Sequence, residues 1–439
     1  MLATLRSNWF AIRASYWFYP ALFALSGLVM ALALVHLDRI GATEWISRSR
    51  LFIPARPEGA SNMLTVLSGS MIGVASTVFS ITIAAVAYAS GNYGPRLLTN
   101  FMEDKGNQFS LAMFIGTFVY AITVLRAVRT EDEPSATLLV QTAGNGGFVP
   151  QLSLLVAFML MIASVGVLVY FLHHIPASIR INTVLENIGG RLLREIAHVF
   201  PEEGERDPAV RAVGLGAWVR ADRTGYVRLI ELGALVDVAM KHSVAIGLKV
   251  RPGDFLYPGV PIARTDAQRL PDDVTEAIRD TFAIGASRTP EMDLEFSFDE
   301  LVEIALRALS PGINDPFTAI TAVHWLGAAT SEVGRRNLDA ESWNSHGPDC
   351  PVAPLLNDFE HFLSRGFGAA RSSLASNRLA ALVALEALGT SRDLVRGSHR
   401  RALLEREMDA LVRQAEDFLT APELTDLRQR QAAIRAGWG

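Results

Sequence analysis

Residues 64–89 read LTVLSGSMIGVASTVFSITIAAVAYA and contain no Asp, Glu, Lys or Arg. A helix of about 20 such residues crosses a hydrocarbon core about 30 Å thick. Three further uncharged runs lie close by in the sequence, at 18–37, 107–125 and 151–172. Buried helices of a soluble protein are the alternative, but four such runs in one N-terminal region are hard to bury together. The sequence therefore predicts a membrane domain of four helices over residues 1–175, with the lipid bilayer as its partner.

The composition supports a membrane class and excludes several others. Of the 439 residues, 50% are hydrophobic and 19% charged, whereas about a quarter are charged in typical soluble proteins. A net charge of −5 provides no basic field for nucleic acid. The lone Cys350 can form neither an intrachain disulfide nor, by itself, a thiolate metal cage. We expect no nucleic-acid partner, no metal and no cofactor.

The 64–89 run has two different faces. At 100° per residue, one stripe collects small and hydroxyl-bearing side chains, whereas Leu67, Met71 and Val78 face the other way. Two interpretations of the small stripe stay open, namely tight helix packing and a water-filled pathway inside a homo-oligomer. No ionisable residue lies in the run, which argues against a proton relay. The candidate pathway or helix-packing residues are Thr65, Gly69, Gly73, Ser76 and Ser80.

The ends of the membrane segments give weaker signals. Residues 90–96, SGNYGPR, predict a break in the helix because two glycines and a proline occur together. An even number of spans places both termini on one side. Basic residues divide almost evenly between the two sides, so we expect cytoplasmic termini mainly from the four-span arrangement. The first run is expected to remain as an anchor, since no A-x-A cleavage site follows it.

The rest of the chain is expected to be a soluble α+β domain. Residues 176–200 carry apolar side chains at helical spacing and predict an amphipathic stalk that continues the fourth span. Residues 209–266 predict a small β-rich unit with strands at 218–221, 226–230 and 244–250. The string KVRPGDFLYPGVPIA at 249–263 resembles the hammerhead turn of lipoyl and biotinyl domains. It has no lysine at its tip, so no carried cofactor is implied. Residues 267–439 are predicted to be mostly helical.

The stretch 287–320 is the densest in polar groups. Converging carboxylates and an Asn could contact a ligand or a divalent ion through oxygen atoms. A purely structural alternative has Asp299 and Asp315 as N-caps, Gly312 with a positive φ, and Glu303 and Arg307 as a surface pair. No catalytic motif is recognisable, so we expect no enzyme and no catalytic residue. The candidate ligand or ion contacts are Arg288, Asp293, Glu295, Glu303, Asn314 and Asp315.

Several strings resemble one protein family. They are GSMIGVASTVFSITIAAVAYAS, NYGPRLL, DKGNQ, RPGDF and LVEIALRALSPGINDPFTAI, and they occur in the order of the bacterial predicted-membrane-protein family called domain of unknown function 2254. The resemblance covers nearly the whole chain, and SPGINDPFTA is its most specific part. It implies a protein of the bacterial inner membrane and brings no known activity.

Two functional hypotheses follow from these features. The first is a homo-oligomeric ion channel or small-solute pathway with a cytoplasmic regulatory domain, because the second span is rich in hydroxyls. The second is a membrane-anchored sensor or scaffold whose soluble domain binds a ligand or partner. A flux measurement on protein in liposomes separates them.

Overall fold

The computed structural model describes residues 15–41, 56–94, 104–129, 148–200, 202, 216–289, 293–338, 350–355 and 358–438. The chain divides into two compact units, with boundaries after Phe10, Ser90, Arg96 and Ile179. We call Ala11–Ser90 with Leu97–Ile179 the membrane unit. The other segments, Met1–Phe10, Gly91–Arg96 and Arg180–Gly439, are the soluble unit. Each is described by itself.

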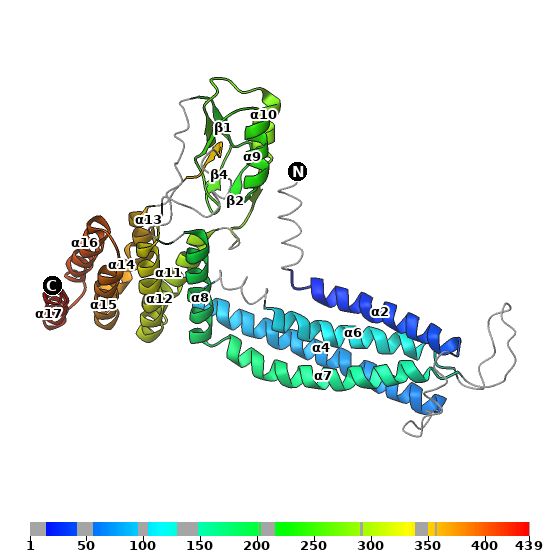
Figure 1. Ribbon diagram of the computed structural model, residues 1–439. Helices are drawn as coiled ribbons and strands as arrows, with labels where there is room; N and C mark the ends of the chain where they lie inside the picture. Colours follow the sequence, from blue (N-terminus) through cyan, green and yellow to red (C-terminus); the bar gives the residue numbers. More distant parts are fainter. Residues whose placement is uncertain are drawn as a thin grey trace. The chain divides into compact units, whose positions relative to one another are not determined.

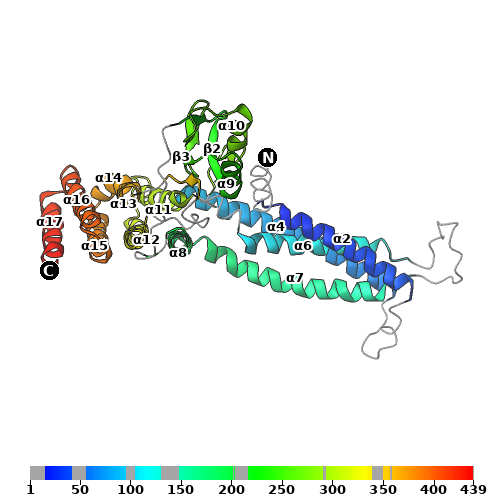
Figure 2. The same cartoon turned by 45° about the horizontal axis from the view of Figure 1, so that its top comes forward.

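The described part of the membrane unit contains four long helices, which Figures 1 and 2 show as a bundle. All four are long and apolar enough to cross a bilayer, which confirms the predicted fold class. Two are longer than expected: one begins before residue 64 and runs past 90, and another continues through Pro176. The helices are α2 (Phe18–Arg39), α4 (Pro57–Tyr93), α6 (Lys105–Leu125) and α7 (Gln151–Ser178).

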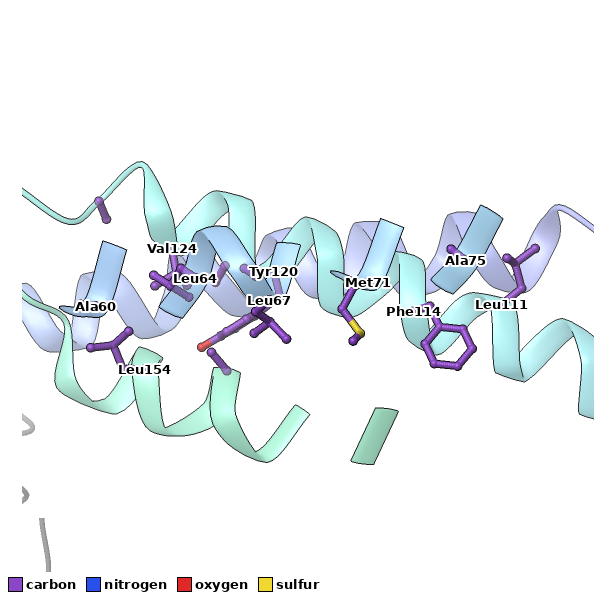
Figure 3. Close-up of a cluster of buried hydrophobic side chains, with 14 of the residues drawn as sticks. Ala60, Leu64, Leu67, Met71, Ala75, Leu111, Phe114, Tyr120, Val124 and Leu154 are labelled. Atoms are coloured by element: carbon purple, nitrogen blue, oxygen red, sulfur yellow. The ribbon is translucent and has the colours of Figure 1, made fainter. Parts of the chain in front are cut away.

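One face of α4 forms the core of this bundle with α6 and α7. Leu64, Leu67 and Met71 are buried there with Phe114 and Tyr120, as Figure 3 shows. The Tyr120 hydroxyl donates to the Ser153 carbonyl at 2.9 Å, which satisfies a polar group that burial would otherwise leave unpaired. The apolar side of α4 predicted from the sequence is therefore the side that packs inside the protomer.

The predicted stalk is a helix of the soluble unit instead. After α7 ends, α8 (Ile181–Val199) starts as a separate helix and packs against α11 and α12. Gly189, which the sequence shows in mid-helix, is buried beside Trp325: a Cβ at this position would lie 2.2 Å from the indole ring. The glycine thus permits close packing, and the apolar face of α8 faces the soluble unit's core.

The β-rich unit contains the expected strands and extends beyond residue 266. Two small sheets have the orders β1-β5-β3-β7 and β4-β2-β6, and every pair is antiparallel except β3–β7. The sequence did not predict β6 or β7, which lie in the stretch expected to be mostly helical. The elements are β1 (Trp218–Arg220), β2 (Gly225–Ile230), α9 (Leu232–Lys241), β3 (Ile246–Leu248), β4 (Phe255–Leu256), β5 (Pro261–Thr265), α10 (Asp272–Arg279), β6 (Phe282–Gly285) and β7 (Val352–Ala353).

The remainder is helical, as predicted, and its helices pack against one another, including helices that are not neighbours in sequence (Figure 1). A short π-helix, η2, interrupts the chain between α13 and α14. The elements are α11 (Leu294–Ala308), α12 (Pro316–Arg335), α13 (Phe359–Leu363), η2 (Ser364–Gly368), α14 (Ala369–Ala375), α15 (Arg378–Leu394), α16 (Ser398–Ala415) and α17 (Ala421–Ala436).

The caps of α11 and α12 confirm one expectation and correct two. Asp315 caps α12 as predicted, accepting from the Thr318 amide at 3.2 Å and from its hydroxyl at 2.6 Å. Asp299 is not a cap, because α11 begins earlier and Asp293 accepts from the Phe296 amide at 3.1 Å. The positive φ expected at Gly312 occurs at Asn314, with φ 49°; Asn tolerates this conformation better than most residues.

Candidate functional site

The small face of α4 is exposed along the whole membrane run. Thr65, Gly69, Gly73, Ser76 and Ser80 are all exposed in the protomer. A Cβ at Gly69 or at Gly73 would meet no atom within 4 Å. The face that the sequence assigned to helix packing or to a pathway therefore packs against nothing in the described part of the chain.

The exposed faces of two other spans differ in chemistry. The exposed face of α2 presents Leu25 (60% exposed) and Leu32 (58%), and that of α7 presents Val165 (53%) and Val169 (64%). Such branched apolar side chains suit contact with lipid tails. Helix α4 also exposes large apolar side chains, among them Val66 (68%) and Phe79 (47%), but its stripe of small and hydroxyl-bearing residues offers lipid tails no such side chains to contact.

Hydroxyls on this face and at its edge, where Thr77 lies, are oriented by their own helix. Thr77 donates to the Gly73 carbonyl at 3.0 Å, and Ser80 donates to the Ser76 carbonyl at 2.9 Å. A hydroxyl that donates to the preceding turn keeps two acceptor lone pairs. The face can therefore offer oxygen acceptors to water or to a cation without holding any charge of its own.

A second polar cluster lies at the start of α11 in the soluble unit. Arg288 binds Asp293 through both carboxylate oxygens, at 2.6 and 2.8 Å, and donates to Asp299 at 2.5 Å. Arg365 donates to the two oxygens of Asp299 at 2.8 and 2.7 Å. Bidentate pairs of this kind fix geometry strongly, so two arginines clamp the N-terminal half of α11. We call this group, with Glu295 and His361, the α11 ion-pair cluster.

Glu295 is the centre of a further set of cations. Arg365 approaches one of its oxygens at 2.7 Å, and His361 and Arg251 approach the other at 2.7 and 3.9 Å. Burial alone would raise the pKa of the Glu295 carboxyl, but the His361 hydrogen bond and the charges of Arg365 and Arg251 hold that pKa below its ordinary value. Glu295 is thus held as a carboxylate by its partners.

The six predicted ligand contacts do not form one site. Arg288, Asp293 and Glu295 come together, whereas Glu303 lies two turns further along α11. Asn314 and Asp315 lie beyond its other end, in the turn that caps α12. The described residues contain no group of three His, Cys, Asp or Glu side chains placed to hold a metal ion. Sequence reasoning missed Asp299 as an ion-pair partner, and it missed Arg251, His361 and Arg365.

A groove follows the C-terminal half of α11. Its volume is about 520 Å³, and its walls combine apolar side chains with two acids and one base. The spacing of four between Asp299, Glu303 and Arg307 places these residues on one face of the helix. That spacing is the sequence signal from which the face could have been recognised. The lining residues are Asp299, Val302, Glu303, Leu306 and Arg307.

These features define an integral membrane protein with an appended α+β unit. The chain belongs to the DUF2254 family of predicted membrane proteins, whose family model matches residues 13–390. Uncharacterised proteins of Mycobacterium tuberculosis and Mycobacterium bovis are 31% identical over 302 residues, which cover 66% of this chain and 55% of each relative. The chain thus spans about half the length of these relatives. No solved structure matches it.

Proposed function

We propose that the protein is a homo-oligomer in which the α4 helices of neighbouring copies surround a pathway for ions or other small solutes. The observation that carries the proposal is the exposed, small and hydroxyl-bearing face of α4, with nothing within 4 Å of a Cβ at Gly69 or Gly73. The soluble unit is the regulatory part of this assembly.

A second copy of the chain is the occupant that this face fits best. Gly69 and Gly73 are four residues apart on one face, which is the spacing that lets two membrane helices approach closely. The chain already uses this kind of contact internally, since Gly27 of α2 lies against Gly116 of α6. Lipid tails make few van der Waals contacts with a surface that lacks side chains, whereas the backbone of a second helix can approach that surface closely and make many.

The hydroxyls favour a water-filled pathway over tight helix packing that excludes water. Ser76 and Ser80 lie one helical turn apart, and the Ser80 hydroxyl donates within the helix, so its oxygen lone pairs remain as acceptors. A ring of such oxygens from several copies can replace part of the hydration shell of a cation or solvate a small polar molecule. The face has no acidic or basic residue between Thr65 and Ala87, so the proposed selectivity rests on pore width and oxygen acceptors.

A membrane-anchored sensor or scaffold is the second candidate. The groove on α11 favours it, because that groove combines an apolar wall with charged groups. On this alternative the α4 face holds copies of the chain together, and no ion or solute crosses the membrane through it. We propose no enzymatic activity for either candidate. We also propose that the protein lies in the bacterial inner membrane with both termini in the cytoplasm.

The test compares two glycines in membrane helices. Gly73 on α4 and Gly166 on α7 are both exposed, and a Cβ at either would meet nothing within 4 Å. Gly73→Leu is expected to dissociate the oligomer in native mass analysis and to abolish ion flux in liposomes, while Gly166→Leu leaves both unchanged. A wild-type protein that is monomeric in nanodiscs and passes no ion or small polar solute would overturn the proposal.

Cysteine pairing provides a second readout for the same face. Cys350 is the one cysteine of the chain, so a Cys350→Ser background allows cysteines to be placed singly. We expect Gly69→Cys and Ser76→Cys to form disulfides between copies, and Val165→Cys on the exposed face of α7 to form none. Equal pairing at all three positions would show that collision in the membrane, and not an α4 interface, brings the copies together.

A further inference from the structure

We infer that α11 transmits conformational changes of the soluble unit to the end of α4 and thereby controls the proposed pathway. This inference rests on the proposed function, because it names the regulation of the same helix. It is carried by one line of charged side chains along α11, which contacts the rest of the soluble unit at one end and the last residues of α4 at the other.

The line consists of four residues spaced by four. Glu295, Asp299, Glu303 and Arg307 occur at i, i+4, i+8 and i+12 of α11. Each is turned about 40° from the one before, so neighbours in the line are close and the line winds over about 120° of the helix surface. The helix is about 22 Å long, at about 1.5 Å per residue over its length. An uninterrupted helix is stiff, so a shift imposed at one end of this face is carried to the other.

The first half of the line is fixed to two other parts of the soluble unit. Glu295 contacts Arg251 of the β-rich unit and Arg365 of η2, and Asp299 contacts Arg365. Gly253, beside Arg251, has φ +96°, and a Cβ there would lie 2.4 Å from the Asp293 carboxylate. The RPGDF turn therefore sits directly against the start of α11, and movement of the β-rich unit is transmitted to this end of the helix.

The second half of the line holds the end of α4. The Arg307 guanidinium donates a hydrogen bond to the Gly91 carbonyl. Gly94, buried and with φ +127°, lies against Glu303: a Cβ at Gly94 would be 2.5 Å from a carboxylate oxygen. The last carbonyls of a helix have no partner within the helix, and a cation placed there stabilises them. Arg307 supplies that cation to α4.

The contact at the end of α4 can affect the proposed pathway because α4 is one continuous helix. It runs from Pro57 to Tyr93 and contains the entire uncharged run 64–89. Only Gly91–Tyr93 of this helix belongs to the soluble unit. A displacement of Arg307 or Glu303 therefore acts on the final turn of the helix whose exposed face we propose to line the pathway.

The groove marks the place where a stimulus can act. Its lining includes Asp299, Glu303 and Arg307, which are three of the four residues of the line. Any ligand or partner that draws Arg307 away from Gly91 releases the last turn of α4. The same release follows from rotation of α11, since Gly94 leaves no room for Glu303 to shift inward.

Two variants and one control test the transmission. Arg307→Gln removes the charge. Gly94→Ala places a side chain at φ +127°, where L-residues are strained, and its Cβ would lie 2.5 Å from a Glu303 carboxylate oxygen, which must move. Arg335→Gln, at an exposed arginine that pairs with Glu332 near the end of α12, is the matched control. Amide hydrogen exchange is measured over residues 88–93 in nanodiscs, and ion flux is measured in liposomes.

We expect Arg307→Gln to speed exchange in the last turn of α4 about tenfold, as loss of a charged hydrogen bond implies. Gly94→Ala is expected to speed it as well, because the added Cβ displaces Glu303 or the backbone, and both variants are expected to change flux in parallel. The control leaves both unchanged. Faster exchange without any flux in the wild type would refute the proposed pathway and support the contact between α11 and α4. Wild-type flux that both variants leave unaltered overturns the inference, whether or not exchange changes. Arg307→Lys, which keeps the charge, is expected to retain most of the wild-type exchange and flux.

Discussion

Gly27 of α2 lies directly against the backbone of Gly116 on α6: a Cβ at position 27 would be 2.5 Å from the Gly116 carbonyl oxygen. Real Cβ atoms do not approach oxygen so closely, so the two helices can meet here only because residue 27 is glycine. Gly27 and Gly116 thus form a close contact between two helices of the same protomer. In contrast, a Cβ at Gly69 or Gly73 of α4 would meet no atom within 4 Å.

Gly27→Ala is expected to destabilise the membrane unit, whereas Gly69→Ala is not. The first adds a methyl group where backbone atoms already fill the space, and overpacking of this kind costs about 1–3 kcal/mol. The second adds a methyl group where nothing lies within 4 Å. Thermal unfolding in detergent that disperses the protein to monomers measures the difference. Equal melting temperatures for the two variants would contradict the packing of α2 on α6.

Asp315 is expected to act as a helix cap and not as a ligand. Asp315→Ala removes the acceptor for the Thr318 amide, and loss of a cap costs about 1 kcal/mol. Asp315→Ser keeps an acceptor and is expected to restore most of the stability. Melting temperature and liposome flux are measured on both. If the serine variant melts like the wild type but carries no flux, the carboxylate charge has a function that capping does not explain.

The membrane spans and the early strands could be predicted because their signals are local. An uncharged run such as 64–89 identifies a span without reference to other residues, and the strands observed at 218–220 and 225–230 match the predicted ones at 218–221 and 226–230. The strand β7 could not be found in this way, because Val352 pairs with Ile246 from more than a hundred residues away. A strand of two residues is too short to show an alternating pattern of apolar and polar side chains in the sequence.

The candidate site was predicted only in part for a related reason. The sequence shows that Glu295 and Asp299 are acidic and close to a helix, but not which arginines approach them. Arg365 comes from η2, and Arg251 comes from a turn before β4. Likewise, the sequence shows that one face of α4 is small, but only the packing of the whole bundle decides whether that face is covered within the protomer.

Glu295 is expected to make the stability of the soluble unit depend on pH on the acid side. Its pKa is lower in the folded protein than the ordinary 4.5, so the carboxylate contributes stability that is fully present above that value. The contribution is lost as the pH falls through the lowered pKa, because the folded state must then take up the proton.

The comparison of wild type with Glu295→Gln isolates this contribution. At pH 7 the variant is expected to melt at a lower temperature, since Arg365 and His361 lose their anionic partner. The difference is expected to shrink as the pH is lowered below 4.5. Melting curves between pH 3 and 7 check this. A difference that grows toward acid pH would mean that Glu295 is protonated more easily in the folded state, contrary to the effect of its cationic neighbours.

Two adjacent glycines in α8 are expected to respond in opposite directions to the same substitution. Glycine in a helix interior is less favourable than alanine by about 1 kcal/mol, because it loses more backbone freedom on folding. Propensity alone therefore predicts that both Gly189→Ala and Gly190→Ala stabilise the helix. The tertiary structure separates them: a Cβ at 189 would lie 2.2 Å from the Trp325 ring, whereas a Cβ at 190 meets only the flexible end of Arg194, at 3.4 Å.

We expect Gly190→Ala to raise the melting temperature and Gly189→Ala to lower it, the latter by the equivalent of about 1–3 kcal/mol, because Trp325 must leave its place or α8 must move away from α12. A double variant, Gly189→Ala with Trp325→Leu, is expected to recover part of this loss, since the shorter side chain leaves room for the methyl group. If Gly189→Ala proves as stabilising as Gly190→Ala, α8 is not held against α12 and the predicted stalk would be the better description of residues 176–200.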